Sequence, residues 1–315
     1  MINLKITQEI KKEYLKTIFL SLLQRKYFKL FKLNRKGNDI SENKLFSFYK
    51  ELVKAKNLKL NNKRIKLKDI LFADYKTIKL IIDTNKSINF TNEEKDKANS
   101  IYKSFRSKWA YALVEKLDIS SCPYCNRNFI VNFNKNETTV QLDHFFDKST
   151  YPYLAISLYN LIPSCSTCNQ RKSSSKKEIL YPYEDDFNKK AKFTHFFNNK
   201  NEENNQYSIF SKERISLDLN PINKDDLKTE NTIETLRLKE LYNEHKDIVV
   251  ELIQKAEMYN DSYIDELMTN YEGTIFKNRE DLMRLITCGY INDEDINKRP
   301  LSKLIKDISE ELGLI

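Results

Sequence analysis

Apolar residues recur at helical spacing through the first third of the chain. The first stripe consists of Leu15, Ile18, Phe19, Leu22, Leu23, Tyr27, Leu30 and Phe31. A second amphipathic segment covers residues 41–57, with Ser41 as the expected N-cap, and a third covers residues 92–117. The third is rich in Tyr, Phe and Trp, and such a stripe more often forms a core than a surface on which bases stack. We therefore predict a helical region over residues 1–120.

The middle of the chain has a different pattern. Residues 122–133 and 138–146 are short runs of branched and aromatic residues, and the polar segment 134–137 between them predicts a hairpin. Residues 157–165 follow as an expected irregular loop, because Pro163 disfavours helix at Ile162. A helix is expected to begin near Cys165. These elements predict a small α+β core over residues 121–183.

The last third, residues 184–315, is again predicted to be mainly helical. Its longest apolar stripe consists of Leu238, Leu241, Tyr242, His245, Ile248, Val249, Leu252, Ile253, Ala256 and Tyr259. His245 lies on this stripe and is expected to be a hydrogen-bonded core histidine, and His195 is expected to be a strand residue of the same kind. No internal repeat or long low-complexity linker interrupts the chain, so the fold is predicted to be mainly α.

The composition agrees with a globular protein of two or three packed units. The chain has 315 residues, of which 40% are hydrophobic and 31% charged. The longest apolar runs, such as residues 17–23, are too short to span a bilayer. The sequence opens with no charged, then apolar, then small-residue leader, so we expect a cytoplasmic protein.

The net charge of +9 is distributed unevenly. Residues 1–120 hold 28 Lys and Arg against 13 Asp and Glu, residues 121–180 hold 7 against 4, and the remainder holds 19 against 28. The basic first third is a candidate polyanion-binding surface. The alternative is a lysine-rich composition in which solvated side chains cover the helices.

Glycine is scarce, which limits the chemistry that the chain can perform. Only four glycines occur, and neither G-x-x-x-x-G-K-[ST] nor G-x-G-x-x-G is present. Those glycines allow a backbone to approach phosphates closely. Any nucleotide energy that drives this system is therefore expected to come from another protein.

Four of the five cysteines form two pairs with metal-ligand spacing. Cys122 and Cys125 form one C-x-x-C motif, and Cys165 and Cys168 form another. Two such turns supply four thiolates, the tetrahedral set that holds structural Zn²⁺ and leaves no position open for a substrate. The alternative is four buried free thiols. The fifth, Cys288, is expected to be a small buried hydrophobe.

A second group of polar residues lies between and beside the cysteine pairs. Asp143 and His144 end a predicted strand, Asn160 lies in the following loop, and Asn169 directly follows Cys168. Asp143 and Asn169 offer the oxygen ligands that Mg²⁺ prefers, and it needs few protein groups beside a phosphate. His144 can accept a proton from water near neutral pH. These residue types suit hydrolysis of a phosphodiester by a metal-assisted mechanism.

The motifs C-P-Y-C, L-D-H-F, Y-N-L-I-P-S-C and C-x-x-C-N-x-x-K, over residues 121–177, resemble those of the HNH endonucleases. That family folds as a hairpin and a helix around one metal, the ββα-metal arrangement. The resemblance implies that Asp143 and Asn169 bind a catalytic Mg²⁺ or Mn²⁺ ion and that His144 is the general base. It also implies that Asn160 braces the loop and orients the base, and that the paired cysteines hold a structural zinc between two helical regions.

The basic segment after the second cysteine pair is a candidate nucleic-acid contact. It contains Arg171, Lys172, Lys176 and Lys177, which could bind backbone phosphates, or could form an ordinary solvated surface. The sequence departs from the family at Asp147, where many relatives have Pro. We expect Asp147 to cap a turn, and the alternative is a further carboxylate near the metal.

The regions outside the motif are similar, more loosely, to HNH effectors of Septu-type and retron anti-phage systems. This similarity implies a defence nuclease, with DNA favoured as the substrate, that is controlled by an ATPase or another partner. Two alternatives stay open. One is a zinc-stabilised nucleic-acid-binding module without activity, and the other is a toxin of the same fold that cleaves RNA such as transfer RNA.

Overall fold

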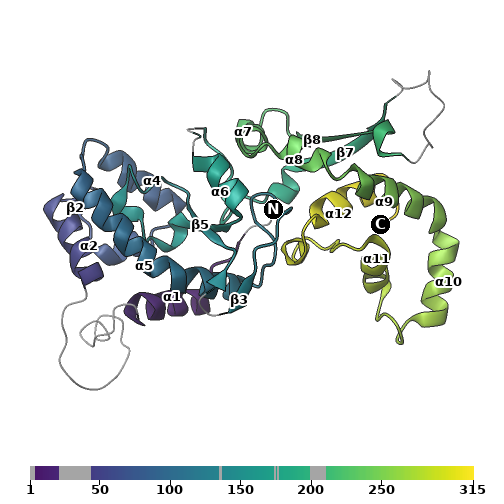
Figure 1. Ribbon diagram of the computed structural model, residues 1–315, viewed down its shortest axis with the longest axis horizontal. Helices are drawn as coiled ribbons and strands as arrows, with labels where there is room; N and C mark the ends of the chain where they lie inside the picture. Colours follow the sequence, from purple (N-terminus) through teal and green to yellow (C-terminus); the bar gives the residue numbers. More distant parts are fainter. Residues whose placement is uncertain (1–3, 21–43, 135–136, 174, 176, 199–210) are drawn as a thin grey trace. The chain divides into compact units, whose positions relative to one another are not determined.

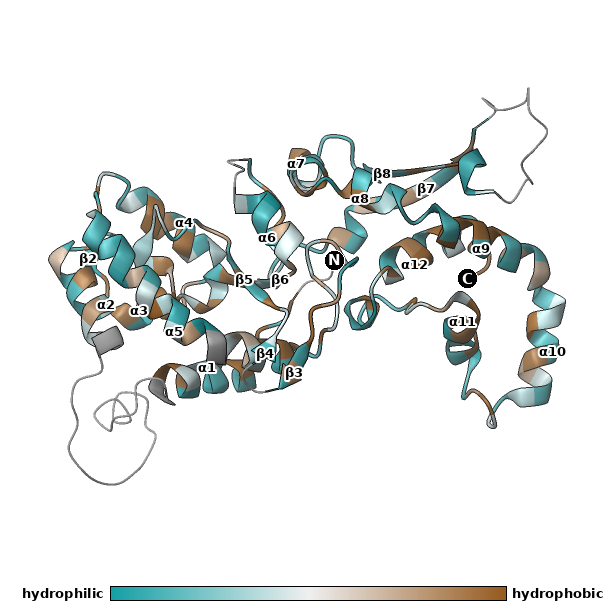
Figure 2. Ribbon diagram, viewed as in Figure 1, coloured by the Kyte–Doolittle hydropathy of each residue, from teal (hydrophilic) through white to brown (hydrophobic). Residues whose placement is uncertain are grey.

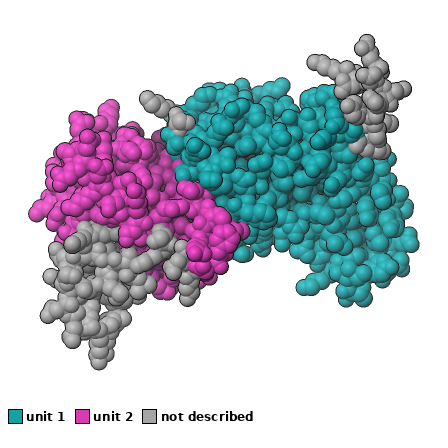
Figure 3. All heavy atoms as spheres, in the orientation of Figure 1, with its two compact units in different colours: residues 1–4, 118–130, 165–315 teal, residues 5–117, 131–164 magenta. Residues whose placement is uncertain are grey.

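The computed structural model describes residues 4–20, 44–134, 137–173, 175, 177–198 and 211–315. The chain divides into two compact units, drawn in separate colours in Figure 3. Unit 1 contains residues 1–4, 118–130 and 165–315, and unit 2 contains residues 5–117 and 131–164. The chain thus passes between the units twice within residues 121–183. The division into regions 1–120, 121–183 and 184–315 stays a prediction.

Unit 2 contains the helices of the first third and, among its described residues, three short strand pairs (Figure 1). Its helices are α1 (Gln8–Leu20), α2 (Lys44–Ala55), α3 (Leu67–Leu71), α4 (Tyr75–Thr84) and α5 (Asn92–Leu117), with 3-10 turns at Pro152–Leu154 and Leu158–Asn160. Its strands are β1 (Lys59–Leu60), β2 (Lys63–Arg64), β3 (Asn132–Asn134), β4 (Glu137–Thr138), β5 (Gln141–His144) and β6 (Leu161–Ser164).

The long helix α5 has the range that the hydrophobic pattern predicts. Its start is fixed by a capping box, in which the Glu94 amide donates to Thr91 Oγ1 and the Thr91 amide donates to the Glu94 carboxylate. The rings of Phe105 and Trp109 on α5 pack against the ring of Tyr14 on α1, and all three side chains are fully buried. The interpretation of this aromatic stripe as core is confirmed.

The other two helices predicted in the first third are confirmed in part. Helix α1 contains the beginning of the first apolar stripe and is described as far as Leu20. The rest of that stripe, and the expected N-cap Ser41, lie outside the described residues. Helix α2 begins at Lys44 and ends at Ala55, inside the predicted segment.

The strand pairing differs from the sequence prediction. The turn at residues 134–137 does join an antiparallel pair, the short strands β3 and β4. Strand β5, which contains Asp143 and His144, instead pairs with β6, so residues 161–164 form a strand where an irregular loop was expected. In a two-stranded sheet Pro163 needs no amide on its outer edge, and Leu161 and Ile162 are apolar and fully buried, which favours the strand.

Unit 1 contains one long strand pair and most of the remaining helices (Figure 1). Its strands are β7 (Ala191–Phe197) and β8 (Ile215–Pro221), paired antiparallel. Its helices are α6 (Ser166–Ser173), α7 (Leu227–Leu236), α8 (Leu238–Asn243), α9 (Lys246–Met258), α10 (Asp261–Tyr271), α11 (Arg279–Thr287) and α12 (Ser302–Glu311), with 3-10 turns at Phe187–Lys189, Lys212–Arg214 and Ile296–Lys298. The chain is therefore mainly helical with small sheets, as predicted.

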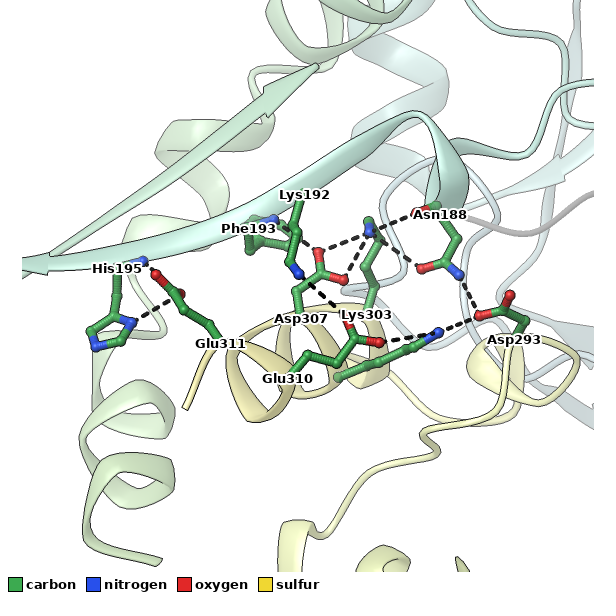
Figure 4. Close-up of polar contacts among 10 residues, drawn as sticks. Asn188, Lys192, Phe193, His195, Asp293, Lys303, Asp307, Glu310 and Glu311 are labelled. Carbon is green, nitrogen blue, oxygen red and sulfur yellow. Dashed lines mark hydrogen bonds and ion pairs between the residues drawn. The ribbon is translucent and has the colours of Figure 1, made fainter. Parts of the chain in front are cut away.

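Helix α12 contains a buried ion pair whose carboxylate also binds the backbone of β7 (Figure 4). The Lys303 ammonium lies 2.8 Å from a carboxylate oxygen of Asp307, and both side chains are almost fully buried. The Phe193 amide also donates to Asp307, and the Lys303 ammonium donates to the backbone and side-chain oxygens of Asn188. At the edge of this contact, His195 on β7 lies 3.0 Å from the Glu311 carboxylate. Hydrophobic residues of α9 and α12 complete the core and are brown in Figure 2.

Two predictions for the last third are corrected. The stripe over residues 238–259 forms two helices, α8 and α9, rather than one, and His245 lies at the break as the residue preceding α9. There the half-buried His245 ring accepts a hydrogen bond from Arg127 Nε at 2.8 Å. Cys288 is exposed, not buried, because it ends α11 in the left-handed conformation (φ 60°) and its side chain leaves the buried face of that helix.

Candidate functional site

The four paired cysteines converge in unit 1, where they fit a zinc site. Their sulfur atoms all lie within 4.8 Å of one another and all four side chains are buried. Cys125 Sγ and Cys165 Sγ are 4.0 Å apart. Zn–S bonds of about 2.3 Å in a tetrahedron would place the sulfurs roughly 3.8 Å apart, so the cluster needs little adjustment to hold the ion.

Hydrogen-bond donors surround the sulfur atoms, as expected for thiolates that bind a metal. The Arg127 amide donates to Cys125 Sγ at 3.4 Å, and the Cys165 amide donates to Cys122 Sγ at 3.3 Å. The Asn128 side-chain amide donates to Cys165 Sγ at 3.3 Å. Burial raises the pKa of the Cys122 thiol, so a cation is needed for all four sulfurs to be ionised together.

The first cysteine turn also anchors the C-terminal part of unit 1. Asn126, directly after Cys125, is fully buried, and its side chain donates to the Ile296 carbonyl and accepts from the Lys303 amide. The Tyr242 hydroxyl donates to the Cys125 carbonyl at 2.5 Å. The sequence pattern places Tyr242 in an apolar stripe but indicates none of these contacts, because the partners lie more than a hundred residues away in the chain.

Asp143 and His144 lie next to each other on β5 in unit 2. Asp143 is buried and His144 is half-buried. The β5 strand is held from α5, since the Tyr102 hydroxyl donates to the Leu142 carbonyl at 2.9 Å and the Arg106 guanidinium donates to the Val140 carbonyl at 2.9 Å. The two candidate catalytic residues are therefore on a strand that the helical region of the same unit supports.

The contact of the His144 ring determines which nitrogen can act as a base. His144 Nε2 lies 2.9 Å from the Ala155 carbonyl oxygen. A carbonyl oxygen can only accept a hydrogen bond, so a neutral imidazole in this place is protonated on Nε2 and has its lone pair on Nδ1. The Tyr102 ring packs edge-on against the imidazole, with the ring centroids 4.4 Å apart. The ring of His144 is thus oriented by a hydrogen bond and by packing.

Asn160 holds the loop between β5 and β6 in its conformation. The side chain is fully buried, and its amide oxygen accepts from the Phe146 amide at 2.7 Å. Its amide nitrogen donates to the carbonyls of Phe146 and Leu154 at 3.0 and 3.1 Å. Because Ala155 directly follows Leu154, the same bonds fix the carbonyl that binds His144. The role of Asn160 in orienting a catalytic base stays a prediction.

Asp147 caps the turn that follows β5. Its carboxylate accepts hydrogen bonds from the Ser149 amide, the Thr150 amide and the Thr150 hydroxyl at 2.8–3.1 Å. Burial acts to raise the pKa of Asp147, but these hydrogen bonds outweigh it and lower the pKa below its ordinary value. The turn-capping interpretation is confirmed.

Asn169 and the basic residues that follow it lie on and after α6, in unit 1. Helix α6 begins at Ser166, so the chain passes from β6 to this helix through Cys165 alone. Arg171 and Lys172 are in the last turn of α6, and Lys177 forms an ion pair with Glu234. Lys176 lies outside the described residues. The joint use of Asp143 and Asn169 as metal ligands stays a prediction, since they belong to different units.

Two residues close to His144 were not singled out from the sequence. Tyr102 had been assigned to the core, and it is buried, but its ring also contacts the candidate base. The Lys148 ammonium lies 4.2 Å from the centroid of the same ring. The sequence pattern does not indicate this contact, because Tyr102 is on helix α5 and Lys148 is in the turn after β5, 46 positions later.

Comparison with known proteins agrees with this site. A family model described as HNH endonuclease matches residues 122–175. The matched segment contains the four paired cysteines and the candidate catalytic residues, and the family is the one that the motifs resemble. It is also similar to the Septu protein PtuB of Bacillus thuringiensis, with 30% identity over 102 residues that cover 30% of this chain and 38% of that protein. The match thus spans well under half the length of this relative. No solved structure matches the chain.

Among the described residues, no helix combines the length and the apolar character needed to cross a bilayer.

Proposed function

We propose that this protein is a metal-dependent endonuclease that hydrolyses phosphodiester bonds of nucleic acid. The observation that carries the proposal is the His144 ring, whose Nε2 donates to Ala155 within a matched HNH motif and whose lone pair is therefore on Nδ1. A lone pair held in one direction by a backbone contact is what a general base for water requires. DNA is the favoured substrate, with RNA as the alternative.

Each candidate catalytic residue has a separate role in the proposed reaction. His144 takes a proton from the attacking water at Nδ1, while Asn160 keeps the loop and the Ala155 carbonyl in place. Asp143 and Asn169 would hold a Mg²⁺ or Mn²⁺ ion, which when bound stabilises negative charge on the phosphate and the leaving oxygen. Their carboxylate and amide oxygens match the preference of such hard ions. The zinc in the four-cysteine site takes no part in the reaction, because four thiolates fill its coordination.

The protein is further proposed to act in anti-phage defence under the control of a partner such as an ATPase. This proposal is supported by the similarity to a Septu protein and by the absence of any phosphate-binding loop motif in the sequence. It would place the protein in the cytoplasm, where an invading nucleic acid is exposed.

The catalytic assignment is tested with His144→Ala. Cleavage of plasmid DNA and of total RNA is measured with Mg²⁺, alone and with any recovered partner, and zinc content and melting temperature are measured in parallel. We expect cleavage to be lost while zinc and folding are retained, because the four-cysteine site is built from other residues. Full activity of the His144→Ala variant would falsify the assignment, and loss of zinc would make the variant uninformative, in which case His144→Gln replaces it.

A further inference from the structure

In unit 2, the ring of one tyrosine contacts both a lysine ammonium and the candidate catalytic histidine. The Lys148 ammonium lies 4.2 Å from the centroid of the Tyr102 ring, which in turn packs edge-on against the His144 ring at 4.4 Å. Tyr102 is buried, and its hydroxyl is bonded to the Leu142 carbonyl. The Tyr102 ring is therefore held in place, and it contacts both the Lys148 ammonium and the His144 ring.

Two further cations lie close to this lysine. Lys103 and Arg106 are on α5, next to Tyr102 and one turn beyond it. Burial lowers the pKa of the Lys148 ammonium, and the charges of Lys103 and Arg106 lower it further against the opposing effect of Asp147. Because Lys103 directly follows Tyr102 on α5 and Arg106 lies one turn beyond it, both cations are close to the ring that Lys148 covers.

None of these three cations forms an ion pair with a carboxylate in the part of the chain that the structure describes. The carboxylate of Asp147, the residue before Lys148, already accepts three hydrogen bonds from its own turn. By contrast, Lys116 at the other end of α5 is paired with Glu9 at 2.6 Å. A half-buried ammonium surrounded by like charges is unfavourable without an anion, so the cluster is suited to bind one.

We propose that Lys103, Arg106 and Lys148 form a binding site for a backbone phosphate of the nucleic acid beside the bond that is cleaved. The proposal rests on the nuclease function, and it adds a site from α5, outside the matched motif. Arg106 presents a planar guanidinium and the two lysines present point charges, which together can hold the oxygens of one or two phosphates without reading bases. The site positions the strand so that a neighbouring phosphate reaches His144.

The test compares the salt dependence of binding between charge-removed variants. Lys103→Gln/Lys148→Gln is compared with the wild type and with Lys68→Gln/Lys86→Gln, which removes two exposed lysines of the same unit. Binding of a short fluorescently labelled DNA duplex, and of the matching single-stranded RNA, is measured by anisotropy at several salt concentrations. No Mg²⁺ or Mn²⁺ is added, so that metal-dependent cleavage is avoided, and no chelator is used, so that zinc in the four-cysteine site is retained.

On duplex DNA the slope of log K against log salt is negative, and each neutralised phosphate contact adds about 0.9 to its magnitude. We expect the Lys103→Gln/Lys148→Gln slope to be smaller by about two, the control slope to be unchanged, and the Lys103→Arg/Lys148→Arg variant to restore the wild-type slope. Equal slopes for the wild type and Lys103→Gln/Lys148→Gln, or an equal loss in the control, would overturn the phosphate site. Absence of cleavage by the wild type with Mg²⁺ and partner would instead overturn the nuclease function.

Discussion

At the scale of single residues, the loop carbonyl that contacts the His144 ring is adjacent to a backbone group that Asn160 holds in place. Asn160 satisfies three backbone groups of the loop between β5 and β6, including the carbonyl of Leu154 next to the acceptor of the His144 ring. The Asn160 side chain is itself buried, so its removal leaves these backbone groups without their partner. We therefore expect Asn160 to be a positioning residue whose loss affects both stability and catalysis.

We expect Asn160→Ala to lower the turnover rate at least tenfold and to destabilise the protein by about 1–3 kcal/mol, the cost of leaving buried polar groups unsatisfied. Urea denaturation and cleavage assays with Mg²⁺ check this. Asn85 is a matched control, because it is also buried and also bonds three backbone groups in unit 2. Asn85→Ala is expected to lose similar stability but to keep its turnover per folded molecule. Equal turnover in the two variants would remove the positioning role.

At the scale of elements, the first cysteine turn and helix α12 are connected by buried polar contacts within unit 1. Asn126, directly after the first cysteine pair, accepts a hydrogen bond from the Lys303 amide at the start of α12. The side chain of the same lysine pairs with Asp307 within α12, and the Asp307 carboxylate accepts from the Phe193 amide, which joins α12 to β7 (Figure 4). The metal site and the C-terminal helix are therefore parts of one packed structure.

Loss of the metal should consequently unfold more than the cysteine turns. We expect about one zinc per chain by metal analysis, and we expect Cys122→Ser or Cys168→Ser to lose it together with the cooperative melting transition. Structural zinc supplies binding energy on the order of 10 kcal/mol in small zinc domains, and that energy is folding energy. Cys288→Ser is the control, since Cys288 is exposed and outside the cluster. Metal-free protein with a native melting curve would contradict the zinc assignment.

The buried ion pair of α12 gives a separate prediction. Asp307→Asn leaves the Lys303 ammonium buried without its counter-charge and should destabilise the protein by about 3–5 kcal/mol. Glu310→Gln, which breaks partly exposed ion pairs with Lys192 and Lys306, should have an effect of about 0–1 kcal/mol. Chemical denaturation measures both. The double variant Lys303→Met/Asp307→Leu should recover much of the loss, and failure to do so would mean that the bond from Phe193 dominates.

At the scale of the whole molecule, the net charge of the chain changes sign across the matched motif. The basic residues precede the motif and the acidic residues follow it, with a net charge of +15 over residues 1–120 and −9 over residues 181–315. A basic surface attracts nucleic acid, whereas an acidic one repels it and is better suited to a protein contact. The matched domain covers only residues 122–175, which leaves most of the chain for other roles.

We therefore expect the purified chain alone to cleave weakly or not at all and a protein partner to raise its activity. Pull-down from the native host, followed by cleavage assays with and without the recovered partner, measures this. The His144→Ala variant is the control, since it should capture the same partner without gaining activity. Vigorous cleavage by the chain alone, with no stable partner recovered, would favour a self-sufficient restriction-type nuclease.

The sequence by itself determined the chemistry of the site and the elements with strong local signals. Paired cysteine spacing predicted the four-sulfur cluster, and the helical range 92–117 followed from its hydrophobic pattern, because both signals depend on residues close together in the chain. The turn cap at Asp147 was predictable for the same reason, since its hydrogen bonds reach only two and three residues ahead.

Only the tertiary structure decided which strand pairs with β5, what surrounds His144 and where Cys288 points. Strand β6 pairs with β5 because the intervening loop folds back around Asn160, and Tyr102 reaches His144 because α5 packs on that strand. The break before α9 and the left-handed end of α11 set the places of His245 and Cys288. Each of these outcomes depends on contacts between segments distant in the sequence, whose energies a local pattern does not contain.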